Sequence, residues 1–199
     1  RVRQRLERIF SYSIASKYMK SPNPAAYKDN LQHLLPKVSK TANVKHMRSL
    51  DYYELPNLIN ELFELKTTSS LALIFKISTA ARTSEVIGAQ WNEFDLTNKI
   101  WTIPASRMKK RREHVVPLND LACMIINNMP KHNSSEFIFL NNSKKSHIDN
   151  NKMNVTLKTY LPEFHKKTVP HGFRSSFRNW AEENYNFSRR AVELCLSHT

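Results

Sequence analysis

The chain has 199 residues, with 31 Lys and Arg against 17 Asp and Glu, so its formal net charge at pH 7 is +14. Its content of 40% hydrophobic and 24% charged residues is typical of a globular protein and excludes a disordered one. No apolar run approaches the roughly 20 residues that a membrane-spanning helix requires, which excludes membrane-spanning roles. The excess of positive charge favours a polyanionic partner.

Cysteine and glycine usage narrows the chemistry further. Cys123 and Cys195 are the two cysteines, and neither has a second Cys or a His at metal-ligand spacing. We expect plain thiols in a reducing cytoplasm, and no metal ion. Two glycines are too few for the loops that cradle ATP or nicotinamide nucleotides, so we expect no cofactor. The first eight residues are rich in charged side chains and lead into no apolar segment, so they do not have the pattern of a secretory signal peptide. The sequence does not begin with Met, so we expect it to be a fragment.

Helices dominate the first part of the chain. Apolar residues at helical spacing predict an amphipathic helix over residues 1–20. The proline-containing and weakly periodic stretch that follows predicts a linker over 21–47, and the compact domain is expected at 48–199. Within it, an apolar stripe predicts a helix over 55–65, and Ser69 or Ser70 could cap a second helix over 71–79.

After residue 90 the hydrophobic pattern changes from that of helices to that of strands. Apolar and polar residues alternate over 91–96, 99–103 and 114–118, which predicts a small three-stranded antiparallel sheet. Helical patterns return over 121–129, 151–161, 171–184 and 188–199. The expected fold class is therefore α+β, mainly α-helical with a small three-stranded antiparallel sheet.

The first candidate site residue is Arg82, in the pattern Thr-x-x-Arg-x-x-Glu that ends at Glu85. An arginine between core elements is costly unless its donors are satisfied. One interpretation is a local ion pair with Glu85 at a helix start. The other is that the guanidinium faces a phosphate oxygen while Glu85 holds it in place.

The second candidate is a basic loop between two strands, with five cations in six positions: Arg107, Lys109, Lys110, Arg111 and Arg112. Such a loop can be a solvated surface or a nonspecific phosphate contact. It can also carry a lysine that gives a proton to a leaving oxygen.

The third candidate is the pair His171 and Arg174, which lie three residues apart at an expected helix start and so share one face. The His171 imidazole, a proton-transfer group, and the Arg174 guanidinium, a bidentate phosphate ligand, would then point in the same direction. The alternative is a histidine that caps the helix and an arginine in solvent. His198, in Leu-Ser-His, carries little information by itself.

The order of these motifs is more specific than any one of them. The chain contains, in this order, Thr-x-x-Arg-x-x-Glu, a Trp-rich strand pair, a basic hairpin that ends in His-Val-Val-Pro-Leu, His-Gly-Phe-Arg and a late Leu-Ser-His. This order resembles the catalytic domain of tyrosine recombinases, in particular prophage integrases. The resemblance implies site-specific recombination of double-stranded DNA at attachment sites, by metal-independent cleavage and rejoining through a 3′-phosphotyrosyl intermediate. It also implies that the full-length enzyme assembles as a tetramer on DNA. The fragment could be a monomer, and its oligomeric state stays open.

The same resemblance assigns roles to residues. It implies a set of catalytic side chains that act on the scissile phosphate: Arg82, Lys109, His171, Arg174 and His198. The arginines would clamp the phosphate, the lysine would protonate the departing 5′ oxygen, and the histidines would assist proton transfer and hydrogen-bond the phosphate. Glu85 would order the site, and Lys110 is the adjacent alternative for the lysine. The remaining loop cations, with Lys110, would contact DNA: Arg107, Arg111 and Arg112.

The nucleophile of this family is a tyrosine a short way beyond the late histidine. The seven tyrosines of this chain all precede His198, and Tyr185 is interpreted as a helix-end aromatic residue. The chain is therefore expected to be catalytically incomplete, and residues 1–20 to be the last helix of a preceding core-binding domain. Two other readings stay open: a noncatalytic DNA-binding module, and a metal-dependent nuclease, although no suitable Asp/Glu cluster is visible.

Overall fold

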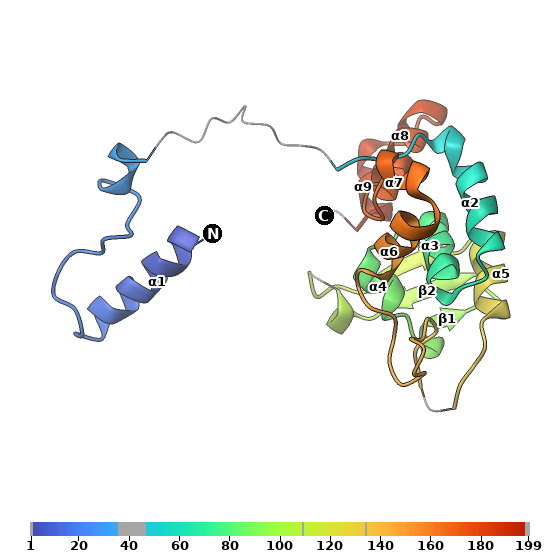
Figure 1. Ribbon diagram of the computed structural model, residues 1–199, viewed down its shortest axis with the longest axis horizontal. Coiled ribbons are helices and arrows are strands. Elements are labelled where there is room, and N and C mark those ends of the chain that lie inside the picture. Colours follow the sequence, from blue (N-terminus) through green and yellow to red (C-terminus); the bar gives the residue numbers. More distant parts are fainter. Residues whose placement is uncertain (1, 36–46, 109, 134, 198–199) are drawn as a thin grey trace. The chain divides into compact units, whose positions relative to one another are not determined.

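The computed structural model describes residues 2–35, 47–108, 110–133 and 135–197, and it divides into two units, Arg1–His46 and Met47–Thr199 (Figure 1). Unit 1 contains helix α1 (Val2–Ala15) and a 3-10 turn at Leu31–His33. After α1 the chain folds back, because the Asn23 side chain donates to the Glu7 carbonyl at 2.8 Å. The helix is therefore shorter than the one predicted over residues 1–20. The assignments of residues 1–20 to a core-binding domain and of 21–47 to a linker stay predictions.

Unit 2 combines helices with one small sheet. Its α-helices are α2 (Leu55–Glu64), α3 (Thr68–Thr79), α4 (Thr83–Ile87), α5 (Asp120–Asn128), α6 (Lys152–Tyr160), α7 (Pro162–Lys167), α8 (Phe173–Asn184) and α9 (Arg189–Cys195). Its strands are β1 (Phe94–Asp95), β2 (Ile100–Ile103) and β3 (His114–Pro117), and 3-10 turns lie at Tyr52–Glu54, Trp91–Glu93 and Ala105–Arg107. The predicted fold class is confirmed.

Helix α3 is the centre of the core. It packs against α2, α4, α5 and α6 (Figure 1), and its middle residues, 72–75, are fully buried. An apolar helix of this kind needs neighbours on all sides, which explains its central place. The helix begins earlier than predicted, because Thr67 and not Ser69 or Ser70 is the N-cap: its hydroxyl accepts the Ser70 N–H at 3.1 Å.

The sheet is antiparallel in the order β1-β2-β3, with Trp101 opposite both Phe94 and Val116. Trp101 is fully buried and stacks on Phe94, and its ring centroid lies 5.3 Å from that of Phe75 in α3. The aromatic contact joins the sheet to the central helix. Residues 91–93 were predicted as part of a strand, which is wrong: they form a 3-10 turn in which the Glu93 carboxylate accepts the Gln90 N–H at 3.3 Å.

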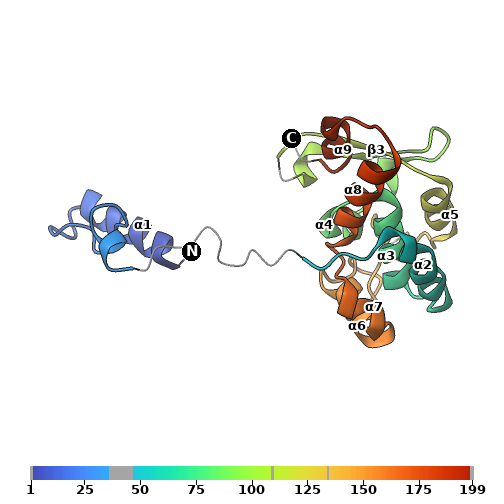
Figure 2. The same cartoon turned by 90° about the horizontal axis from the view of Figure 1, so that it is seen from above.

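The C-terminal helices pack over the end of the sheet. Figure 2 shows α9 beside β3, with α8 next to α9, and these three elements line a cavity of about 420 Å³. Helix α8 begins at Phe173, two residues later than predicted, so His171 lies in the turn that precedes it. Helix α7 was not predicted, because six residues are too few to show a helical period. Among the described residues, no helix has both the length and the apolar character needed to cross a bilayer.

Candidate active site

Arg82 stands between α3 and α4 as the N-cap residue of α4. Its backbone N–H and its Nη1 each donate to one oxygen of the Glu85 carboxylate, both at 2.7 Å. Glu85 is nearly fully buried, whereas the Arg82 side chain keeps 24% of its surface exposed. The local ion pair predicted for this segment therefore forms. The pair uses Nη1 of the guanidinium, whereas Nη2 donates to a carbonyl oxygen after the end of α9.

Arg174 reaches the same place from α8. It is 4% exposed, and its Nη1 donates to the carbonyl oxygen of Ala80, two residues before Arg82. Burial lowers the pKa of Arg174 to about 10, and the positive charge of Arg82 acts in the same direction. The alternative of an arginine in solvent is therefore wrong. Two positive charges are therefore held in the same part of the structure, partly removed from solvent.

The two arginines share an acceptor at the end of α9. Arg174 donates through Nη2 to the carbonyl oxygen of Leu196, and Arg82 Nη2 lies 3.4 Å from that oxygen and 2.9 Å from the carbonyl oxygen of Ser197. Carbonyl oxygens are acceptors, as the oxygens of a phosphate diester are. The arrangement therefore presents two converging cationic donors to oxygen atoms, from segments that are far apart in the sequence.

Arg107 differs from the other cations of the basic loop. It forms an ion pair with the buried Glu93, which also accepts the indole N–H of Trp101 at 2.9 Å. Its Nη2 donates to the carbonyl oxygen of Glu85. Arg107 thus connects the base of the hairpin to α4 and supports the residue that orients Arg82. Its predicted contact with DNA stays a prediction, and in this structure its guanidinium is engaged internally.

The tip of the hairpin is solvent-exposed. Lys110, Arg111 and Arg112 are all exposed, and Arg111 has a positive φ of 51°. Lys109, the predicted proton donor, lies outside the described residues. The loop between β2 and β3 therefore carries three cations that are accessible to a polyanion.

The two predicted histidines differ in what the structure describes. His171 is exposed, and its carbonyl oxygen accepts the Arg174 N–H at 3.3 Å across the first turn of α8. This hydrogen bond ties the position of His171 to that of Arg174. His198 lies outside the described residues, directly after the Leu196 and Ser197 carbonyls that the arginines contact. The structure thus brings together the side chains of Arg82, Glu85 and Arg174, and the backbone of His171 is bonded to that of Arg174.

Comparison with known proteins identifies the family. The family model described as the phage integrase family matches residues 48–199. This chain belongs to the phage integrase family. The integrase of Enterobacteria phage P4 is 26% identical over 215 residues, covering 100% of this chain and 47% of the relative. Prophage integrase IntA of Escherichia coli K12 is 32% identical over 158 residues, covering 77% and 38%. The chain thus spans about half or less of the length of these relatives.

Solved structures agree on the fold. A Tn1549 transposon integrase in complex with transposon right end DNA superimposes with a TM-score of 0.69 at 14% identity, over 98% of this chain and 69% of the other. A lambda integrase tetramer bound to a Holliday junction gives 0.64 at 15% identity, over 100% and 57%. The predicted resemblance to tyrosine recombinases, as a fold and as a family, is confirmed.

The sequence analysis missed two titratable residues whose pKa values are lowered by burial and by the arginine pair. Lys76 in α3 is fully buried, and its signal was a single lysine that interrupts the apolar run of that helix. His114, the first residue of β3, was noticed only as part of the His-Val-Val-Pro-Leu motif. Burial lowers the pKa of His114. The negative charge of Glu85 raises this pKa, and the positive charge of Arg82 lowers it. Both residues therefore lie within electrostatic reach of the arginine pair.

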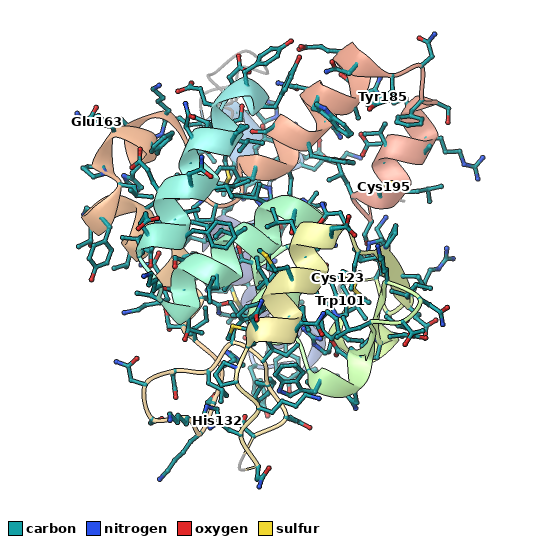
Figure 3. The ribbon with its side chains drawn as sticks, turned by 90° about the vertical axis from the view of Figure 1, so that its right-hand side faces the viewer. Trp101, Cys123, His132, Glu163, Tyr185 and Cys195 are labelled. Carbon is teal, nitrogen blue, oxygen red and sulfur yellow. The ribbon has the colours of Figure 1, made fainter. Side chains whose placement is uncertain are left out.

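Tyr185 is placed away from the arginine pair by its packing. It is the residue that ends α8, and its ring contacts Trp180 edge-on at 5.1 Å and stacks on Phe187 at 5.0 Å. Figure 3 shows Tyr185 at the C-terminal end of α8 and Cys195 at the C-terminal end of α9, on the side of the hairpin. The described part of this integrase holds no group of three or more His, Cys, Asp or Glu side chains placed to share a metal ion.

Proposed function

We propose that this chain carries the phosphate-binding part of the active site of a site-specific DNA recombinase, one that integrates and excises phage or prophage DNA. The supporting observation is the convergence of Arg82 and Arg174 on the Leu196 carbonyl oxygen. One phosphate diester offers two oxygens to such a pair of guanidinium groups. Membership of the phage integrase family supports the same function.

The chemistry is the transfer of a phosphoryl group without a metal ion. The oxygen of a tyrosine hydroxyl bonds to the phosphorus and gives up its proton with the help of His171; the bond to the 5′ oxygen breaks, and Lys109, or Lys110 beside it, supplies the proton that this oxygen takes up. Arg82 and Arg174 stabilise the negative charge that grows on the non-bridging oxygens. The strand is then held as a 3′-phosphotyrosyl ester until a 5′ hydroxyl reverses the reaction.

The remaining residues support these steps. His171, tied to Arg174 by a backbone hydrogen bond, assists proton transfer, and His198 hydrogen-bonds the phosphate. Glu85 acts through Arg82, because its carboxylate fixes both the backbone N–H and the guanidinium of that residue. The exposed cations of the hairpin contact the DNA backbone next to the cleaved phosphate.

The relatives suggest the partners. The lambda integrase structure is that of a tetramer bound to a Holliday junction, and the Tn1549 structure that of an integrase with transposon end DNA. We propose that the full-length protein likewise assembles as a tetramer on double-stranded attachment sites in the bacterial cytoplasm. Its recognition sequence depends on contacts with base edges, which these residues do not determine.

The test is covalent trapping, with the protein that its complete gene encodes and a nicked duplex that carries its recognition sequence. A covalent protein–DNA adduct should form in the presence of EDTA. Arg82→Ala and Arg174→Ala should each lower the rate of adduct formation by about 10²- to 10³-fold, the usual cost of losing one charge-stabilising donor. Circular dichroism should show that both variants fold.

The control is Lys158→Met, which removes an exposed cation from α6. It should form the adduct at the wild-type rate. Wild-type rates in either arginine variant would remove that arginine from the site. Tight binding without any adduct would instead favour a noncatalytic DNA-binding module, and activity that EDTA abolishes would favour a metal-dependent nuclease.

A further inference from the structure

Lys76 is a fully buried lysine in the last turns of α3, directly behind the arginine pair. Its Nζ donates to the carbonyl oxygen of Ala81 at 2.6 Å. An ammonium group in the core loses the hydration that water would give it, which is costly unless strong partners replace that hydration. A residue of this kind needs an explanation that packing alone does not supply.

The acceptor of Lys76 belongs to the turn that presents Arg82. Ala80 ends α3 in the left-handed conformation, with φ 50°, and its carbonyl oxygen accepts Arg174; the carbonyl oxygen of Ala81 accepts Lys76. Ala81 lies between the C-cap of α3 and the N-cap of α4, and a buried carbonyl at such a position needs a hydrogen-bond donor from elsewhere. The backbone of residues 80–82 is thus held from the core by Lys76 and from α8 by Arg174, so the position of Arg82 depends on both.

The charge of Lys76 is coupled to the site. Burial, followed by the positive charge of Arg174, lowers the pKa of Lys76 to about 7, while Glu85 raises it and Arg82 lowers it further. Among the described residues, His114 of β3 responds to the same arginines and to Glu85, and Arg178 and Glu193 act on Arg174. A bound phosphate brings negative charge to the arginines and so offsets the repulsion that disfavours the ammonium form.

We propose that Lys76 is a positioning residue of the DNA-cleavage site, one that holds the turn of residues 80–82 from inside the core and takes up a proton when a DNA phosphate binds to Arg82 and Arg174. The proposal rests on the proposed function. In the neutral form, the amine donates one N–H to the carbonyl oxygen of Ala81. On binding, the lone pair of Nζ takes a proton from solvent, and the resulting ammonium makes a stronger, charge-assisted hydrogen bond to the same carbonyl. Phosphate binding thereby tightens the turn that carries Arg82.

The direct test is a titration of Lys76 by NMR, in wild-type protein with ¹³Cε-labelled lysine and with the signal assigned by its loss in Lys76→Met. The free protein should titrate near pH 7. Saturation with a short double-stranded DNA should move the titration midpoint upward by about one pH unit or more. A midpoint near the ordinary lysine value of about 10.4 in the free protein, or a midpoint that DNA leaves in place, would overturn the proposal.

The second test is the pH dependence of DNA affinity, measured by fluorescence anisotropy with the same duplex. Because binding takes up a proton, the wild-type affinity should fall as pH rises above about 7, by up to tenfold per pH unit. Lys76→Met cannot take up this proton, so its affinity should lose that dependence; Lys158→Met should keep it. A purely structural role of Lys76 would lower affinity equally at every pH.

Variants of the arginines separate this inference from the proposed function. If Arg82→Ala and Arg174→Ala weaken binding while Lys76→Met keeps the wild-type pH dependence, only the role of Lys76 is wrong. If neither arginine variant weakens binding, the phosphate site itself is wrong, and the role of Lys76 fails with it.

Discussion

At the scale of single residues, two ion pairs of the same sequence spacing have different surroundings. Arg82 and Glu85 are three residues apart and joined at 2.7 Å, and so are Glu163 and Lys166 on α7. Glu85 is almost fully buried, whereas Glu163 keeps 77% of its side chain exposed. Water and salt screen an exposed pair, and they do not reach a buried one. The same spacing in the sequence therefore gives a buried pair in one place and an exposed pair in the other.

We predict that Glu85→Gln destabilises the protein by about 1 to 3 kcal/mol, because an amide group replaces one acceptor of the Arg82 donors. Cleavage should fall as well, since Arg82 loses its orientation. Urea unfolding and the rate of adduct formation measure the two effects. The matched variant Glu163→Gln should change neither, and a similar loss in both variants would show that burial does not distinguish the pairs.

At the scale of elements, the position of α8 depends on one close backbone approach. Gly172 caps α8, and a Cβ atom placed there would lie 2.0 Å from the carbonyl oxygen of Arg48. The Ser176 hydroxyl, one turn later, donates to the carbonyl oxygen of Leu50. The chain that enters unit 2 thus fixes the start of α8, and with it the depth at which Arg174 enters the core.

We predict that Gly172→Ala costs about 3 kcal/mol of stability, because backbone rather than a flexible side chain meets the added methyl group. Thermal unfolding measures this cost. Gly88→Ala is the matched change: its Cβ would lie 3.0 Å from Arg107 Nη2 and 3.3 Å from the carbonyl oxygen of Ser84, both much farther than the 2.0 Å at Gly172, so the loss should be about 1 kcal/mol. Equal losses would contradict the importance of the approach to Arg48.

At the scale of the whole molecule, the net charge of +14 predicts DNA binding that depends on salt. If about 6 to 10 phosphates are contacted, the affinity should fall by about 10³ to 10⁵ between roughly 50 and 200 mM salt. The exposed hairpin cations Lys110, Arg111 and Arg112 should account for part of this dependence.

We predict that replacing all three with alanine reduces the slope of log affinity against log salt by up to about 2.7, since each lost phosphate contact contributes about 0.9. A salt titration of duplex binding measures the slope. Replacing the exposed lysines 144, 145 and 158 with alanine removes the same charge from outside the hairpin. An equal change of slope in both triple variants would indicate that net charge, not the hairpin, determines the contacts.

The sequence was sufficient for patterns that repeat within one element. Apolar periodicity identified the major helices and the three-stranded sheet, because a helix or strand buries one face at a fixed period. It was insufficient for α7 and for residues 91–93, where six or fewer residues leave no period to observe. There, side-chain hydrogen bonds decide the local structure, as the Glu93 carboxylate does for its turn.

The sequence by itself determined the family, through the order of its motifs, and the basic character that suits a polyanionic partner. Only the tertiary structure decided that Arg82 and Arg174 meet at the end of α9, that Arg107 pairs with a buried glutamate, and that Lys76 is fully buried. The physical reason is that burial, and with it the strength of each charge, depends on contacts between segments far apart in the chain.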